Sequence, residues 1–150
     1  IQNRYQLVSG LGRTFVDGDA GRFKADVGLT YTVQKDVDPT PGADDGFAGY
    51  RLSAEAVRTL SETSRFQSEL VLNNSFSNSD DVRVDWLNSL SVSVNSTLAL
   101  KSSLQLLWDN APALVSVPLE TSGGTPTGTD VLTPSDDLDT VLTLTLVITL

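Results

Sequence analysis

The chain has 150 residues, enough for a single domain. Its net charge is −9, from 10 basic and 19 acidic residues, which argues against a nucleic-acid partner because such partners need basic patches. The sequence has no Cys, His or Met, so thiol catalysis, a Ser-His-Asp triad and zinc sites built from His or Cys are excluded.

Six successive segments alternate between apolar and polar residues, and this period of two predicts β-strands. In chain order they cover about 4–16, 22–35, 47–60, 65–77, 82–94 and 97–109. Helix is the competing interpretation for 52–63, because Ala, Glu and Leu all favour it. The alternation continues through 66–72, so we predict a strand there as well.

A seventh strand is predicted at 138–150, where Leu142, Leu144 and Leu146 alternate with Thr143 and Thr145. No stretch of the chain approaches the ~20 consecutive apolar residues of a transmembrane helix. A membrane β-barrel escapes that criterion, since each of its strands is only half apolar.

The connections between these strands alternate in length. Short ones are expected near 17–21, 61–64 and 95–96, long ones near 36–46 and 110–137, and a medium one near 78–81. Transmembrane barrels place short turns on the periplasmic side and longer loops outside. We therefore predict one all-β domain over 1–150, an antiparallel up-and-down β-barrel with seven visible strands, eight or more when closed, and long loops at about 36–46 and 110–137.

The two faces of each strand suggest different surroundings. In a membrane barrel the apolar face meets lipid and the polar face lines the lumen, whereas a soluble barrel reverses this. Strands of about 12–14 residues, against the usual ~5–6, favour the membrane. Arg58, on the apolar face near a strand end, counts against it unless the side chain snorkels.

On the membrane interpretation, we predict structural ion pairs in the lumen among Arg51, Glu55, Arg65, Glu69, Arg83, Asp85 and Lys101. We also predict an aromatic girdle of Tyr31, Tyr50, Phe76, Trp86 and Trp108. The alternative is a solvated outer face with weak surface ion pairs.

Several segments resemble a known family. They are Ser9–Gly12, Gly28–Tyr31, Tyr50–Leu52, Leu60–Phe66, Leu106–Pro112 and Asp139–Leu142. In these, the chain resembles the C-terminal part of the bacterial salt-induced outer-membrane proteins, a family of unknown function. The resemblance implies an outer-membrane β-barrel and brings no catalytic residues with it. One departure is the end of the chain at Leu150, where outer-membrane barrels usually carry an aromatic residue.

The strand count is odd, whereas bacterial single-chain barrels normally have an even number. The chain begins at Ile1, so we expect a processed or truncated product that lacks at least one strand, unless a strand is hidden near 114–119. Alternatively, open edges pair with another copy, because an unpaired edge is a template for pairing.

These observations predict a non-enzymatic barrel of the bacterial outer membrane. Its lumen would be filled by side chains, its role would be structural or in envelope adaptation, and its partner would be the lipid bilayer. No catalytic residue, cofactor or dedicated metal site is expected, although divalent cations could bind the acidic loops, as at Asp36, Asp38, Asp44 and Asp45. One alternative is a subunit of an extracellular filament or other homomeric assembly, joined through strand edges and acidic loops. The other is a soluble lipocalin-like binder of small ligands.

Overall fold

The computed structural model describes residues 3–35, 46–112, 114–124 and 126–148, and every structural statement below concerns these. They form strands and turns only. Within these ranges, no helix is long and apolar enough to cross a membrane.

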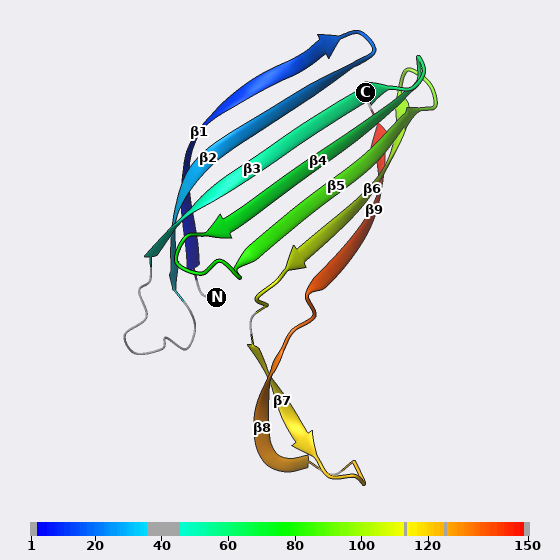
Figure 1. Cartoon of the computed structure of the whole chain (residues 1–150). Helices are drawn as coiled ribbons and strands as arrows, with labels where there is room; N and C mark the ends of the chain where they lie inside the picture. Colours follow the sequence, from blue (N-terminus) through cyan, green and yellow to red (C-terminus); the bar gives the residue numbers. More distant parts are fainter. Residues whose placement is uncertain (1–2, 36–45, 113, 125, 149–150) are drawn as a thin grey trace.

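Seven strands form one sheet in the order β1-β2-β3-β4-β5-β6-β9, and each neighbouring pair is antiparallel (Figure 1). The prediction of seven antiparallel strands is confirmed. The helical alternative for 52–63 is wrong, because β3 continues as a strand to Thr59. The strands are β1 (Asn3–Gly18), β2 (Gly21–Lys35), β3 (Gly46–Thr59), β4 (Ser64–Ser75), β5 (Val82–Ser93), β6 (Leu98–Asp109) and β9 (Leu138–Ile148).

The connections separate onto two ends of the sheet. One end, called the short-turn end, holds the turn at Asp19-Ala20 and the connections 60–63 and 94–97 (Figure 1). At the other, the long-loop end, β2 ends and β3 begins, and the connections β4–β5 and β6–β9 lie there. Side chains stabilise the short turns locally. The Ser61 and Ser64 hydroxyls lie 2.6 Å apart, and Asn95 Oδ1 accepts hydrogen bonds from the backbone N–H groups of Thr97 (2.9 Å) and Leu98 (2.8 Å).

The segment 110–137 was expected as one long loop, with a hidden strand near 114–119 as the alternative. This segment contains a hairpin of β7 (Leu114–Glu120) and β8 (Pro126–Pro134), which projects from the long-loop end (Figure 1). Val115, Val117 and Leu119 alternate as a strand requires, although Pro118 interrupts the run. A strand near 114–119 was expected as one way to complete the barrel. It pairs with β8 in a separate sheet instead, so the main sheet keeps seven strands.

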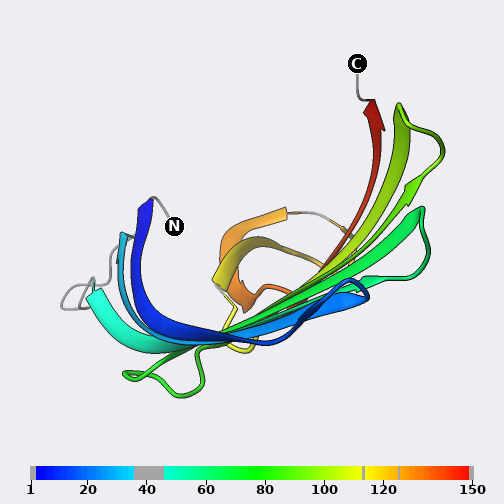
Figure 2. The ribbon, with the colours of Figure 1, turned by 90° about the horizontal axis from the view of Figure 1, so that it is seen from above.

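The main sheet is strongly curved but not closed, because β1 and β9 do not pair with each other (Figure 2). Glycines permit close approach of the backbones where a side chain would obstruct it. A Cβ on Gly10 would lie 2.3 Å from the carbonyl oxygen of Val27, and one on Gly49 would lie 2.2 Å from that of Asn74. The closed barrel predicted from the sequence is therefore present only as an open, curved wall.

Burial in this wall is the reverse of that in a soluble domain. None of the described hydrophobic residues is buried. The buried polar residues are Thr30, Thr32, Ser75 and Ser89, with exposed fractions of 6%, 0%, 5% and 5%. The pairing registers place all four on the polar face of the sheet. This sheet has no hydrophobic core of its own among the residues described.

Candidate functional site

The polar face is the concave one. Gln6, Thr30, Asn73 and Arg83, from β1, β2, β4 and β5, line one small cavity together. In a flat sheet, β1 and β5 would lie about 19 Å apart, at ~4.8 Å for each strand step. Only curvature toward this face brings their side chains around a common space, so we call it the concave face.

The predicted ion-pair residues all lie on the concave face, but no ion pair joins two of them in the described part of the chain. Glu55 pairs with Arg22, and Arg83 pairs with Asp81 and Asp109. Asp85 accepts a 2.9 Å hydrogen bond from Gln105 Nε2, and Glu69 accepts one of 2.5 Å from Gln67 Nε2. Arg51, Arg65 and Lys101 have no ion-pair partner within the described ranges.

Strand register explains this outcome. Glu55 lies on β3, between β2 and β4. It stands directly opposite Lys24 on β2 and directly opposite Glu69, a residue of like charge, on β4. Lys24 contacts Asp26 of its own strand at 3.2 Å (Nζ to Oδ1). Arg22 therefore reaches Glu55 diagonally, a contact that no sequence pattern signals.

The densest polar cluster lies at the long-loop end and consists of Asp81, Arg83 and Asp109, which we call the Arg83 node. Arg83 Nε lies 3.0 Å from Asp81 Oδ1 and 3.2 Å from Asp109 Oδ2. Neither contact has the direction of an N–H hydrogen bond, so the node is held by charge. Backbone hydrogen bonds run alongside it, from Asn110 N to Val82 O (3.0 Å) and from Asp109 N to Asp137 O (2.8 Å). The node thus ties the start of β5 to the end of β6, and the backbone bond from Asp109 to Asp137 links this place to the start of β9.

The electrostatic balance of the node is visible in the pKa of Asp81. Burial, and secondly the negative charge of Asp109, raise this pKa above its ordinary value of 3.8. The nearby guanidinium of Arg83 does not reverse the shift. The Asp81 carboxyl is therefore easier to protonate than a free one.

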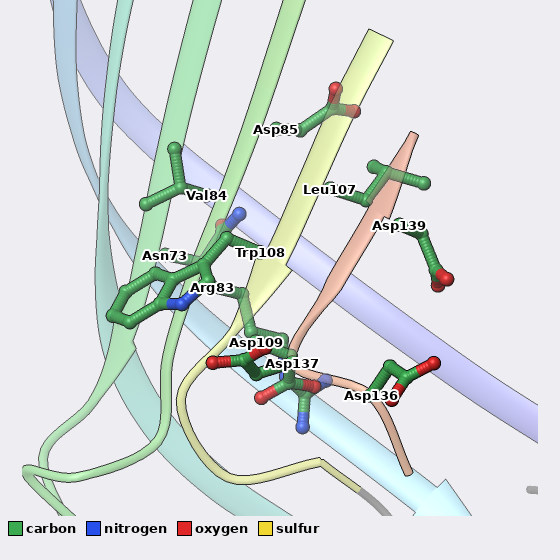
Figure 3. A pocket seen from close by; sticks show the side chains of 10 residues that line it. All are labelled: Asn73, Arg83, Val84, Asp85, Leu107, Trp108, Asp109, Asp136, Asp137 and Asp139. Atoms are coloured by element: carbon green, nitrogen blue, oxygen red, sulfur yellow. The ribbon is translucent and has the colours of Figure 1, made fainter. Parts of the chain in front are cut away.

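A pocket of about 230 Å³ lies beside the node (Figure 3). Arg83 and five carboxylates form the charged part of its lining, and Asn73, Val84, Leu107 and Trp108 form the rest; the carboxylates are those of Asp85, Asp109, Asp136, Asp137 and Asp139. Within the described ranges, no three metal-ligating residues come together closely enough to hold a metal ion. The pocket offers no arrangement of nucleophile and base. The acidic residues at 36–45, where cation binding was considered, lie outside the described residues.

The opposite, convex face carries the exposed apolar side chains. Leu29, Leu142 and Leu144 have exposed fractions of 65%, 67% and 69%. The face is not uniformly apolar, since the registers place Ser68 opposite Asn88 in its middle. Its other large, exposed members include Tyr5, Leu7, Leu11, Val27, Tyr31, Leu52, Leu70, Trp86, Leu90, Leu100, Leu104, Leu146 and Ile148.

The predicted girdle residues are all on or next to this convex face. Tyr50 and Phe76 are in contact, with ring centroids 5.8 Å apart, at the long-loop end, and Tyr31 lies close to that end of β2. Trp108 is the penultimate residue of β6, at the same end. Trp86 lies nearer mid-strand, where its Nε1 donates a 3.0 Å hydrogen bond to Ser68 Oγ.

A second aromatic group at the short-turn end was not anticipated. The rings of Phe15 and Phe23 lie 5.9 Å apart, and the guanidinium of Arg13 stands 5.6 Å from the Phe15 ring. Both phenylalanines stand beside the first short turn, and this position next to a predicted turn was the sequence signal that could have indicated an aromatic group at the short-turn end. Aromatic side chains therefore mark both ends of the convex face.

Comparison with known proteins adds a family assignment. No curated protein and no solved structure matches the chain. A family model described as "Protein of unknown function, DUF481" matches residues 1–120, which include β1 to β7. That match spans most of the chain, and the chain therefore belongs to this family of unknown function.

Proposed function

We propose that this chain forms the wall of a β-barrel in a bacterial outer membrane, has no enzymatic activity, and serves a structural or envelope-adaptation role. The observation that carries the proposal is the inverted burial. The buried residues are Thr and Ser on the concave face, and the large apolar side chains cover the convex face. In water such a surface is costly, whereas lipid accommodates it.

Strand length supports the same proposal. The shortest strands of the main sheet have 11 or 12 residues. Twelve residues rise about 40 Å, and a tilt of about 45° reduces this to about 28 Å across the membrane. The outward-facing apolar band of an outer-membrane barrel is about 25 Å tall. Every strand of the main sheet is thus long enough to cross it.

The two ends of the sheet also fit an asymmetric membrane. Outer-membrane barrels have short periplasmic turns and longer external loops, with aromatic residues at both interfaces. Here the short turns share one end, the β7–β8 hairpin and the β4–β5 connection lie at the other, and aromatic groups occur at each. We infer that the short-turn end faces the periplasm.

The concave face would line a lumen filled by side chains. Its polar groups bridge neighbouring strands, as in the Arg22–Glu55 pair and the hydrogen bond from Gln105 to Asp85. The salt-induced outer-membrane proteins, which the sequence resembles, suggest a place in envelope adaptation. The expected partner is the bilayer, and the proposed role requires no cofactor.

Tryptophan fluorescence provides a direct test, because the only two tryptophans, Trp86 and Trp108, both lie on the convex face. We expect lipids brominated on their acyl chains to quench both. Deep bromines should quench Trp86 more strongly, and shallow bromines Trp108. The variants Trp86→Phe and Trp108→Phe separate the two signals. A folded protein that stays monodisperse without detergent and shows no quenching would refute the proposal.

A homomeric extracellular assembly is the second candidate, favoured by the free edges of β1 and β9. Electron microscopy of a detergent-free preparation would show ordered fibres if it is right. The lipocalin-like alternative needs apolar side chains on the concave face, where the buried residues are polar.

A further inference from the structure

The two edge strands of the main sheet lack a neighbour. The outer edges of β1 and β9 have no strand partner in the described part of the chain. Residues 5–18 of β1 and all of β9 are exposed on both faces. Natural proteins protect such edges with prolines, charges or short strands. β9 has eleven residues, with no proline and only one charged residue, Asp139. It is an unprotected template for a further strand.

The directions of these edges restrict what can pair with them. Six antiparallel steps separate β1 from β9, so both run from the long-loop end to the short-turn end (Figure 1). If β1 paired directly with β9, the contact would be parallel in an otherwise antiparallel sheet. The edges also stand well apart in the curved sheet (Figure 2). An even number of added strands, such as the two of the β7–β8 hairpin, would leave one parallel contact as well.

A second copy of this sheet does not solve the problem. Copies joined head to tail, β9 to β1, would again meet in parallel. Copies related by a two-fold axis would pair β1 with β1 in antiparallel fashion, but one copy would then be upside down. Its long loops would lie on the opposite side of the membrane, contrary to the single-sided arrangement proposed above.

We propose that the edges of β1 and β9 are joined by an odd number of further amphipathic strands, the outermost of which run antiparallel to both. This inference rests on the proposed outer-membrane location, because open sheet edges do not persist in lipid. The added strands would place alternate apolar side chains on the convex surface and polar ones on the concave surface. They would face edges of 16 residues in β1 and 11 in β9.

Cysteine crosslinking in the full-length protein in lipid tests this, because the chain has no native cysteine. Leu7→Cys on β1 is combined in turn with Leu142→Cys, Leu144→Cys and Leu146→Cys on β9, which covers several registers. The matched control is Leu104→Cys with Leu142→Cys, which stand directly opposite each other on β6 and β9. We expect the control to form a disulfide and the β1–β9 pairs to form none, since even one intervening strand separates them by about 10 Å.

Hydrogen exchange supplies the second readout, because occupied edges should exchange their amides as slowly as the central strands β4 and β5. A β1–β9 disulfide within one molecule would overturn the proposal in favour of direct closure. A dimer crosslinked through Leu7→Cys alone would overturn it in favour of a second copy. Rapid exchange along β1 and β9 would show that the edges are open. Any of these three results overturns the inference about added strands. If brominated lipids still quench the tryptophans, the proposed outer-membrane location stands.

Discussion

Replacement of Leu104 by arginine tests which medium the convex face contacts. Leu104 is the seventh residue of β6, stands between Asn88 of β5 and Leu142 of β9, and is 40% exposed. Burying a whole leucine is worth about 1.5–3 kcal/mol, so covering the exposed two-fifths with lipid contributes about 0.6–1.2 kcal/mol. Leu104→Ala should lose roughly that amount. An arginine near the bilayer midplane costs about 2–4 kcal/mol, or roughly 30-fold to 1,000-fold in the unfolding equilibrium.

The matched control is the next residue, Gln105→Arg, on the concave face. Gln105 already donates to Asp85, so an arginine there meets a carboxylate rather than lipid. The assay is reversible urea unfolding from lipid vesicles, followed by tryptophan fluorescence. In water, a substitution on an exposed surface changes stability by only about 0.5 kcal/mol in either direction. If Leu104→Arg costs no more than Gln105→Arg, the convex face does not contact lipid, and the reasoning is refuted.

Three further predictions concern the long-loop end. Arg83→Ala leaves two partly buried carboxylates without a cation and should lower the free energy of unfolding by about 1–3 kcal/mol. The control Arg65→Ala removes no ion pair among the described residues and should cost less. Equal losses in urea unfolding would contradict the role of the Arg83 node. The pKa of Asp81 is raised in the folded state, so the folded protein binds the proton of this carboxyl more tightly than the unfolded chain does. The contribution of Asp81 to stability is therefore fully present below pH 3.8 and declines as the pH rises through the raised pKa. Asp81→Asn should therefore flatten a decline in stability with rising pH, and identical pH profiles for both proteins would contradict this. Replacing 114–134 by a Gly-Ser linker should leave the melting temperature unchanged, because in the described part of the chain the β7–β8 hairpin makes no extensive contact with any strand of the main sheet. A drop of several degrees in circular dichroism melting would contradict this.

The sequence predicted the strands closely because their signal is local. The alternation over 82–94 and 97–109 corresponds to β5 at Val82–Ser93 and β6 at Leu98–Asp109. Ser61–Ser64 and Asn95-Ser96 marked short turns through side chains that bond to nearby groups. Of the β7–β8 hairpin, the sequence indicated only the first strand, as an alternative near 114–119. The second strand, Pro126–Pro134, was missed, and the turn before it uses Gly124 at a φ of 76°.

The candidate site was predictable only in part. The charged residues of the concave face could be placed on one parity, but their partners could not. Glu55 meets Arg22, 33 positions away, and Arg83 meets Asp109, because pairing registers bring them together. The raised pKa of Asp81 likewise depends on burial that arises only at the long-loop end.

The sequence by itself predicted the seven strands of the main sheet, their succession along the chain and the separation of apolar from polar faces, since a period of two depends only on neighbouring residues. Only the tertiary structure decided that the polar face is concave, which charges meet across it, and that β1 and β9 stay apart. Curvature and register arise from contacts between strands, and no local pattern encodes on which side a sheet will bend.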